Sequence, residues 1–436
     1  MRASFSRSLP LLLTTVALAT GCAEHTNVAR ALLSPPGDSR QPTIVVRPDT
    51  AASNARTLIG PAYHSPVLGD VGSSSFRIER DADAAASSVA PVRVMLALAN
   101  GPFQVWSPAD LEVELYPGDR PTSWSNRLAI NAHGDTLVVD GQQVGSDIRL
   151  RSTGSDLGVQ LQGKRYAGDL RFLAENGKVR IINELPLEEY LRGVVPAEVS
   201  PTWQPEALKT IAVAARTYAL FQMEQSSNRG WDVTDTIDTQ VYGGLSAADP
   251  RSDRAVRDTE GQILIYDGAP ILATYHASSG GHTEDASRVW SKDVPYLRAQ
   301  VDPAPDANTA PWRASVAMKE IERLLKSIGY RVSKISDVSV IERTPSGRAE
   351  TVRVRHSRGF IDLAAAKLKA LLGGQRIHST LFQIARTKTA VLFSGKGYGH
   401  GVGLSQLGAA SLANDGVAYQ QILYAYYPGT QLAHLQ

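Results

Sequence analysis

The chain has 436 residues, of which 43% are hydrophobic, and its 45 basic and 43 acidic residues give a formal net charge of +2. This near balance argues against a nucleic-acid-binding protein that depends on a basic surface. The single cysteine excludes an intramolecular disulfide, so an apolar core must stabilise the fold.

The N-terminus has the pattern of an export signal. Arg2 and Arg7 precede a mostly apolar run, residues 9–19, which is too short to span a bilayer comfortably. The run ends in Leu-Ala-Thr-Gly directly before Cys22, an arrangement that resembles a bacterial lipobox. The alternative is an ordinary cleaved signal with an incidental cysteine. We predict a lipoprotein-type signal peptide over residues 1–22 and lipidation of Cys22. The exported protein would be anchored in the bacterial cell envelope by this lipid alone, in the periplasm or at the outer membrane if the host has two membranes.

The rest of the chain is expected to form a tether and one α+β domain. Residues 23–90 are rich in Ala, Ser, Pro and Asp without sustained periodicity, which predicts a flexible low-complexity tether. Residues 91–436 begin with a β-rich first part, continue with two helices, and include a second small α+β lobe at about 303–390. We expect the β-rich first part with its two helices and the second small lobe to face a cleft.

The two helices carry the first candidate site. The segment from 185 to 199 reads Leu-Pro-Leu-Glu-Glu-Tyr-Leu-Arg-Gly-Val-Val-Pro-Ala-Glu-Val, with apolar residues at helical spacing. Pro196 is predicted to end this helix and Pro205 to begin the next. Apolar neighbours of Glu198 would raise the pKa of its carboxyl group and keep it protonated near neutral pH. Spacing alone favours the alternative, a solvated glutamate at a helix end.

Arg216 falls on the flank of the small-residue stripe of the second helix. A partly buried guanidinium requires a carboxylate or an oxygen-rich ligand. The sequence leaves open whether Arg216 serves a site or a structural salt bridge.

Two further segments contain side chains capable of chemistry. His276 and His282 stand six positions apart, a spacing that matches neither a zinc-protease helix nor a zinc finger. Two unrelated loop histidines are therefore the alternative to a metal site.

The segment from 395 to 406 alternates glycine with residues such as Tyr398 and His400. It contains neither G-x-G-x-x-G nor G-K-[S/T], which argues against a nucleotide site. Its glycines suit close approach to a bulky ligand or a tight turn.

The segment Asp-Thr-Ile-Asp-Thr-Gln-Val-Tyr-Gly-Gly, residues 235–244, combines acids, an amide and an aromatic ring. These residue types suit sugar binding, and they equally suit a capped loop.

In combination these motifs resemble the stage II sporulation protein D family, also called the amidase-enhancer family. The resemblance spans roughly residues 92 to 432 in the family's motif order. Its segments are the 185–198 motif, Ala-Val-Ala-Ala-Arg-Thr-Tyr-Ala at 212–219, Asp-Thr-Gln-Val-Tyr-Gly-Gly at 238–244, Tyr-His-Ala-Ser-Ser-Gly-Gly at 275–281, Gly-His-Gly-Val-Gly-Leu-Ser-Gln at 399–406, and Tyr-Tyr-Pro-Gly-Thr at 426–430.

The resemblance implies that residues 91–436 are a lytic transglycosylase of peptidoglycan. Members cleave the bond between N-acetylmuramic acid and N-acetylglucosamine, preferring peptide-stripped strands, and leave a 1,6-anhydro sugar. Glu198 matches the catalytic acid and base, while Arg216 and His276 match further active-site positions. The residues matching substrate-binding positions are Gln240, Tyr242, Ser278, Tyr398, His400, Ser405 and Gln406.

The resemblance also bears on metals and partners. No cofactor is required for the reaction, but some members hold a structural zinc through a histidine and a cysteine six residues on. His276 and His282 occupy those places here, so the cysteine is absent. The expected partners are glycan strands of peptidoglycan and, in the alternative function, a cell-wall amidase that a non-catalytic protein would stimulate. A zinc-dependent hydrolase using the two histidines is a third alternative, and nucleic acid is not expected.

Overall fold

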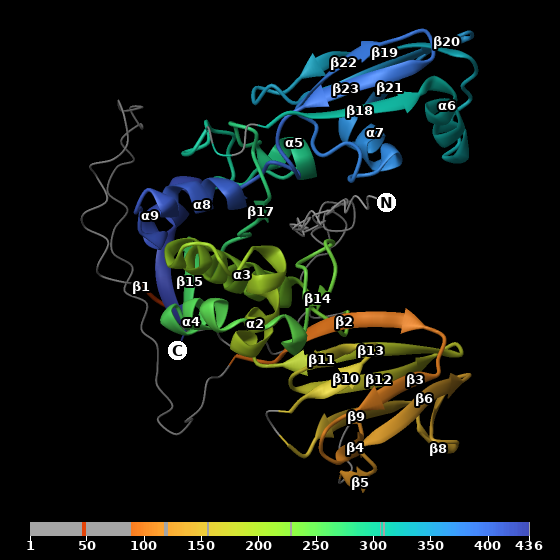
Figure 1. Ribbon diagram of the computed structural model, residues 1–436, viewed down its shortest axis with the longest axis vertical. Helices are drawn as coiled ribbons and strands as arrows, with labels where there is room; N and C mark the ends of the chain where they lie inside the picture. The colour runs from red at the N-terminus through yellow and green to blue at the C-terminus, as the bar shows by residue number, and fades with distance from the viewer. Residues whose placement is uncertain are drawn as a thin grey trace, which may run out of the picture.

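The computed structural model describes residues 46–48, 89–116, 121–154, 157–226, 229–305, 307 and 310–435. The predicted signal peptide, Cys22 and most of the predicted tether lie outside these residues. The described chain is a mixed α+β protein with a β-rich part, a central group of helices and a smaller α+β lobe, which confirms the predicted fold class (Figure 1). No helix among the described residues has both the length and the apolar character needed to cross a membrane.

Two sheets make up the β-rich part. The six-stranded sheet has the order β11-β10-β3-β6-β7-β8, and the seven-stranded sheet has the order β14-β2-β13-β12-β9-β4-β5. Their strands are β2 (Val92–Ala99), β3 (Phe103–Trp106), β4 (Leu111–Leu115), β5 (Thr122–Trp124), β6 (Arg127–His133), β7 (Thr136–Val139), β8 (Gln142–Gly145), β9 (Asp147–Ser152), β10 (Val159–Leu161), β11 (Lys164–Tyr166), β12 (Asp169–Glu175), β13 (Lys178–Leu185) and β14 (Val233–Thr234).

The sequence alternation of these strands produces the core. In β3, Phe103 and Val105 are buried while Gln104 and Trp106 are exposed, because successive side chains of a strand point to opposite faces. Several strands are joined by two-residue turns that need positive φ at both positions. Between β10 and β11 this turn is Gln162 (φ 50°) and Gly163 (φ 82°).

Helix α2 (Leu187–Glu198) and helix α3 (Pro205–Gln225) follow the last strand of this part. Pro205 begins α3 as predicted. The prediction that Pro196 ends the first helix was wrong, since α2 continues for two more residues to Glu198. Because the φ angle of proline suits a helix, Pro196 interrupts the hydrogen bonding of the last turn without ending the helix. Gly193 in α2 allows close packing, because a Cβ atom there would lie 2.4 Å from the Tyr242 ring.

Helix α3 lies at the centre of the molecule (Figure 1) and is buried along most of its length. Its small residues allow α2, α4, α8, α9 and strand β15 to pack closely around it. The other elements of this central body are η1 (Leu245–Ala247), α4 (Pro250–Asp258), α5 (Ala286–Trp290), α8 (Gln406–Asn414), α9 (Tyr419–Tyr426), and the strands β1 (Val46–Pro48), β15 (Gln262–Tyr266), β16 (Ala269–Pro270), β17 (Tyr275–His276), β24 (Leu404–Ser405) and β25 (Gln431–Leu435). The β-rich part and this body share one continuous hydrophobic core.

The smaller lobe has a core of its own, formed by residues between Trp312 and Phe393. Its two three-stranded sheets have the orders β18-β23-β22 and β19-β20-β21. The elements are β18 (Trp312–Ala317), α6 (Met318–Ser327), β19 (Ile335–Arg343), β20 (Ala349–His356), β21 (Gly359–Ala364), α7 (Ala365–Leu372), β22 (Phe382–Arg386) and β23 (Ala390–Gly395). Because the first strand of the lobe pairs with its last, the lobe leaves and rejoins the central body at neighbouring points.

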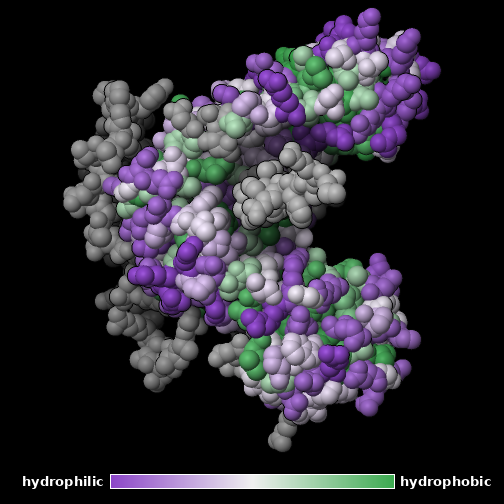
Figure 2. All heavy atoms as spheres, in the orientation of Figure 1, coloured by the Kyte–Doolittle hydropathy of each residue, from purple (hydrophilic) through white to green (hydrophobic). Residues whose placement is uncertain are grey.

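Buried polar contacts attach this lobe to the central body. Arg348, which is 1% exposed, donates hydrogen bonds to the backbone carbonyl oxygens of Ser279 (2.7 Å) and His282 (2.8 Å). The hydroxyl groups of Thr344 and Ser346 donate to the Glu284 carboxylate at 2.6 and 2.8 Å. Figure 2 shows a hollow on one side of the molecule, between this lobe and the β-rich part.

Candidate functional site

Glu198 is the last residue of α2, and three segments far apart in the sequence meet at its carboxyl group. The backbone N–H of Val241 donates to Oε1 at 2.7 Å. The amide nitrogen of Gln406, the first residue of α8, donates to Oε2 at 3.2 Å. The Tyr275 hydroxyl also hydrogen-bonds this carboxyl group. The side chain is half-buried, so it is held in place and remains reachable by a ligand.

These surroundings favour the protonated form of Glu198. Burial raises the pKa of Glu198 from 4.5 to about 7, while its hydrogen bonds with Val241, Gln406 and Tyr275 act in the opposite direction. All three donors are uncharged, so no cation restores the carboxylate to its ordinary pKa. A single carboxyl group near neutrality can both donate and accept a proton, which is the requirement for general acid and base chemistry.

Tyr275 is itself positioned by buried side chains. The Gln240 amide donates to the Tyr275 hydroxyl oxygen at 3.0 Å, and the Tyr190 hydroxyl donates to the Gln240 carbonyl at 3.2 Å. Gln240 is only 1% exposed. In this structure its side chain contacts Tyr190 and Tyr275, so Gln240 holds Tyr275 against Glu198, and substrate binding by Gln240 stays a prediction.

His276 follows Tyr275 on β17 and faces the other way, because neighbouring side chains of a strand point to opposite sides. Its Nδ1 donates to the carbonyl oxygen of Val402 at 3.1 Å, and its ring lies 5.4 Å from the His400 ring. Burial and the nearby Arg348 guanidinium lower the pKa of His276 to about 3, so the ring is neutral. None of the hydrogen bonds described for Glu198 involves His276.

The predicted metal ligands do not fit a metal site. His282 Nδ1 lies 2.7 Å from the carbonyl oxygen of Thr283, and the cationic Arg348 beside His276 opposes a dication. Among the described residues no group of three or more His, Cys, Asp or Glu side chains could hold a metal ion. The buried Nε2 of His276 has no hydrogen-bond partner there, but one imidazole nitrogen does not make a zinc site.

Arg216 belongs to a buried ion pair with Glu188, which lies in the first turn of α2, whereas Glu198 is the last residue of that helix. It is completely buried, and its guanidinium donates to both carboxylate oxygens of Glu188 at 2.7 Å. It also donates to the backbone carbonyl oxygens of Gln262 and Val256 at 3.1 and 3.3 Å. All of these contacts are internal, so the structure favours the alternative of a structural salt bridge and does not support a direct contact with Glu198.

The glycine-rich segment passes close to the site, and its four predicted residues have different roles. Gln406 contacts Glu198, while Ser405 caps α8 by accepting the N–H of Gly408 at 3.1 Å. The Nε2 atom of His400 lies 3.0 Å from the carbonyl oxygen of Tyr275. The Nδ1 atom of His400 accepts the N–H of Val402. Tyr398 is half-buried, with its ring 4.8 Å from the His378 ring.

Several positions of this segment require glycine, and Gly401 is one of them. Gly401 has φ +86°, and a Cβ atom there would lie 2.4 Å from the Arg348 guanidinium. The ligand that approaches this backbone is therefore a side chain of the protein's own smaller lobe.

Two other predicted substrate contacts are buried. Tyr242 is 1% exposed, its hydroxyl donates to Asn183 at 2.8 Å, and its ring packs 5.1 Å from the Tyr190 ring. Ser278 is 2% exposed and pairs through its backbone with Tyr398. In this structure both positions pack the loops that surround Glu198, and their predicted contact with substrate stays a prediction.

The sequence reasoning missed Val241 and Tyr275. Val241 acts through its backbone N–H, which its side chain does not reveal. Tyr275 stands next to His276 in the same motif, and the alternation of a short strand was the one available signal that only one of the two would face Glu198.

Comparison with known proteins is consistent with these motifs. Residues 175–266 match the family model described as stage II sporulation protein, and residues 304–403 match a domain of unknown function, DUF8618. An uncharacterized protein of Brachyspira hyodysenteriae is 33% identical over 276 residues, covering 63% of this chain and 74% of that protein.

Two named relatives come from Bacillus subtilis. Its amidase enhancer is 34% identical over 322 residues, covering 63% of this chain but only 45% of that protein. Its stage II sporulation protein D is 31% identical over 267 residues, covering 58% of this chain and 76% of that protein. This chain belongs to the stage II sporulation protein D and amidase enhancer family.

Proposed function

We propose that this protein is a lytic transglycosylase that cleaves the N-acetylmuramic acid–N-acetylglucosamine bonds of peptidoglycan. The observation that carries the proposal is the Glu198 carboxyl group, half-buried, held by three uncharged donors, with its pKa raised to about 7. Hydrolases of glycosidic bonds use two carboxyl groups, one of which activates water or forms a covalent bond to the sugar. None of the hydrogen bonds described for Glu198 involves a second carboxyl group.

One carboxyl group suffices if the sugar supplies its own nucleophile. The protonated Glu198 donates its proton to the glycosidic oxygen as the bond from that oxygen to C1 of N-acetylmuramic acid breaks. The resulting carboxylate then takes the proton from the C6 hydroxyl of the same sugar, and that oxygen forms the new bond to C1. The products are a free C4 hydroxyl on N-acetylglucosamine and a 1,6-anhydro ring. Glu198 ends protonated as it began, and no water is consumed.

The fixed donors explain how one group serves in both steps. When Glu198 gives up its proton, the Val241 N–H and the Gln406 amide already point at its two oxygens, so the new charge is stabilised without rearrangement. The Tyr275 hydroxyl, fixed by Gln240, supplies a third such contact. Peptide-stripped strands are the proposed substrate.

Product analysis tests the proposal. The purified protein would be incubated with peptide-free glycan strands, and the fragments would be weighed by mass spectrometry. We expect fragments ending in 1,6-anhydro-N-acetylmuramic acid, which are lighter by one water than hydrolysis products. Fragments with hydrated ends would point to a hydrolase and overturn the transglycosylase.

The activity is expected to fall at alkaline pH. The acid must be protonated to react, so kcat/KM should be level at low pH, reach half its maximum near the pKa of about 7, and fall about tenfold per pH unit above it. The measurement is the rate of anhydro-end formation between pH 5 and 9. A rate that stays constant from pH 6 to 9 would contradict a role for a titrating Glu198.

A second function is suggested by one relative. The Bacillus subtilis protein that is 34% identical over 322 residues is named amidase enhancer. This chain could accordingly bind glycan and stimulate an N-acetylmuramoyl-L-alanine amidase without cleaving sugars. Under this alternative the glycan would stay intact in the product analysis, and the rate of an added amidase would rise in its presence.

A further inference from the structure

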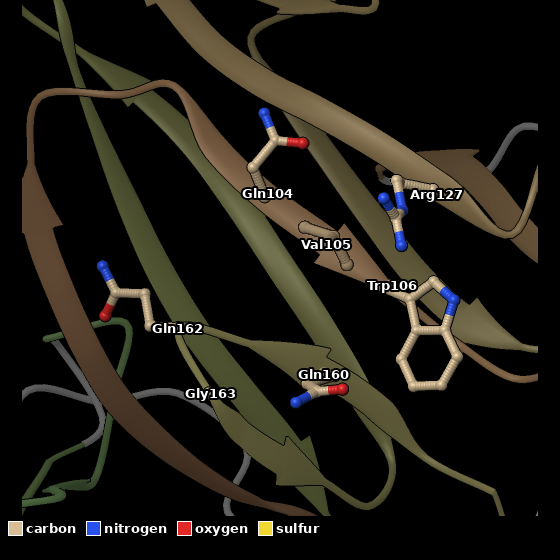
Figure 3. Close-up of a pocket in the computed structure, with 7 residues that line it drawn as sticks. All are labelled: Gln104, Val105, Trp106, Arg127, Gln160, Gln162 and Gly163. Carbon is tan, nitrogen blue, oxygen red and sulfur yellow. The ribbon is translucent and has the colours of Figure 1, made fainter.

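A hollow on the β-rich part has the composition of a sugar-binding surface and lies outside the site around Glu198. It has a volume of about 500 Å³, within the range of small-molecule sites. It lies on the outer face of the six-stranded sheet and at the turn between β10 and β11 (Figure 3). Its lining residues are Gln104, Val105, Trp106, Arg127, Gln160, Gln162 and Gly163.

The register of the sheet sets three of these side chains in a row. Trp106 on β3 is paired with Arg127 on β6 and with Gln160 on β10. Figure 3 shows the indole ring with Arg127 on one side and Gln160 on the other. Directly opposed residues of neighbouring strands have Cβ atoms about 5 Å apart, so the row forms one continuous surface.

This surface has the chemistry of a glycan site. An indole offers a flat apolar face to the C–H face of a sugar ring, and Trp106 is 36% exposed. The side-chain amides of Gln104, Gln160 and Gln162 can both donate and accept hydrogen bonds, as hydroxyl and acetamido groups require. The side chain of Arg127 is exposed and forms no ion pair with any described residue.

Arg127 adds a reason to expect one kind of glycan. Removing the stem peptide from N-acetylmuramic acid leaves a free lactyl carboxylate on each such sugar, so peptide-free strands carry regular negative charge. A guanidinium binds a carboxylate through two parallel hydrogen bonds. Lys164, the residue after Gly163, is a second exposed cation at this edge, 3.7 Å from the Asp235 carboxylate.

The hollow is connected with Glu198 through neighbouring segments. Lys164 lies against the Asp235 carboxylate. The backbone carbonyl oxygen of Asp235 accepts the N–H of Tyr242. Val241, the residue before Tyr242, donates its N–H to the Glu198 carboxyl group. Behind Lys164, the Arg165 N–H donates to the Ser246 hydroxyl at 2.8 Å and fixes β11 against η1. One loop, residues 235–246, therefore joins the edge of the hollow to the carboxyl group.

We propose that the Trp106–Arg127–Gln160 row is a non-catalytic subsite for peptide-free glycan, holding a strand whose more distant part reaches Glu198. This proposal rests on the proposed function for the identity of the glycan. The subsite would favour long, peptide-stripped strands over short fragments and over strands that keep their peptides.

The test is co-sedimentation with insoluble peptidoglycan sacculi, either untreated or after limited amidase treatment that removes part of the peptides and leaves enough cross-links for the sacculi to sediment. All proteins carry Glu198→Gln so that the polymer stays intact. Trp106→Ala is expected to weaken binding to amidase-treated sacculi about tenfold, as for a central aromatic contact, and Trp106→Phe should restore part of it. Arg127→Gln should weaken binding to amidase-treated sacculi more than to untreated sacculi, because the amidase exposes free lactyl carboxylates.

Phe360→Ala is the matched control, since Phe360 is another exposed aromatic residue, 53% exposed, on strand β21 of the smaller lobe. It should bind like the parent, and thermal unfolding should show that all variants are folded. If Trp106→Ala binds within twofold of the parent, or if Phe360→Ala loses as much, the subsite is overturned. If the wild-type protein yields no anhydro ends while Trp106→Ala still loses binding, the proposed function fails and the subsite stands.

Discussion

Replacement of Glu198 by glutamine is expected to lower the rate of anhydro-end formation by roughly 10²- to 10⁴-fold, the usual contribution of a positioned acid or base. The amide has nearly the same shape and can still accept the Val241 N–H, so the fold around it should persist. It cannot donate a proton to the leaving oxygen or reclaim one from the C6 hydroxyl. The measurement is mass spectrometry of fragments from peptide-free glycan under single-turnover conditions.

Glu189→Gln provides the control, because Glu189 lies on the same helix and pairs with Arg192 at the surface. Its activity should match that of the parent. If Glu198→Gln cleaves glycan at the parental rate, the assignment of the acid is wrong.

Thermal unfolding separates lost chemistry from lost structure in the Glu198→Gln protein. The pKa of about 7 in the folded protein is above the ordinary value of 4.5, so the fold binds this proton more tightly than the unfolded chain does. The parent should therefore lose stability as the pH rises from about 4.5 to about 7, and the glutamine variant should not lose this contribution. We expect the Tm of the variant to exceed that of the parent at pH 8 and the difference to shrink at pH 5.

Removal of the partner of Arg216 should have the largest effect on stability. Glu188→Ala leaves a completely buried guanidinium with only backbone carbonyls as partners. Breaking one side of a buried ion pair costs about 3–5 kcal/mol, and since Glu188 is 30% exposed we expect a loss of about 3 kcal/mol in the free energy of unfolding. Chemical denaturation would measure it.

The neighbouring Glu189→Ala is again the control, because its exposed pair with Arg192 should contribute about 0–1 kcal/mol. Equal, small effects of the two substitutions would contradict the structural role assigned to Arg216. A Glu188→Ala protein that kept full stability but lost activity would support the predicted role of Arg216 in the active site.

The sequence predicted best where local rules decide the structure. Helix α3 begins at Pro205 because proline suits a first turn, and the fold class followed from strand patterns and helical stripes. Helix α6, which spans Met318–Ser327, likewise lies within the second α+β lobe that the sequence predicted. In each case the signal depends on residues within a few turns of one another.

The contacts of the candidate site could not be predicted in the same way. Residue type made Tyr242 a plausible sugar contact, but packing against Gly193 and Tyr190 places it in the core. Spacing left the partner of Arg216 undecided, because Glu188 lies on another helix. The Val241 N–H leaves no trace in the sequence, since every residue except proline has such a group.

The hydrogen bonds of Glu198 also determine when the site can be completed. Val241 follows Glu198 by 43 residues and Gln406 by 208, so the second contact closes nearly half of the polypeptide into a loop. Contacts of such long sequence separation form late, after the intervening chain has been ordered. A nascent polypeptide whose helix α8 has not yet left the ribosome lacks the Gln406 amide that donates to Glu198. A fragment that stops short of residue 406 lacks this donor permanently. A wall-cutting activity built this way would be withheld until synthesis and folding are almost finished.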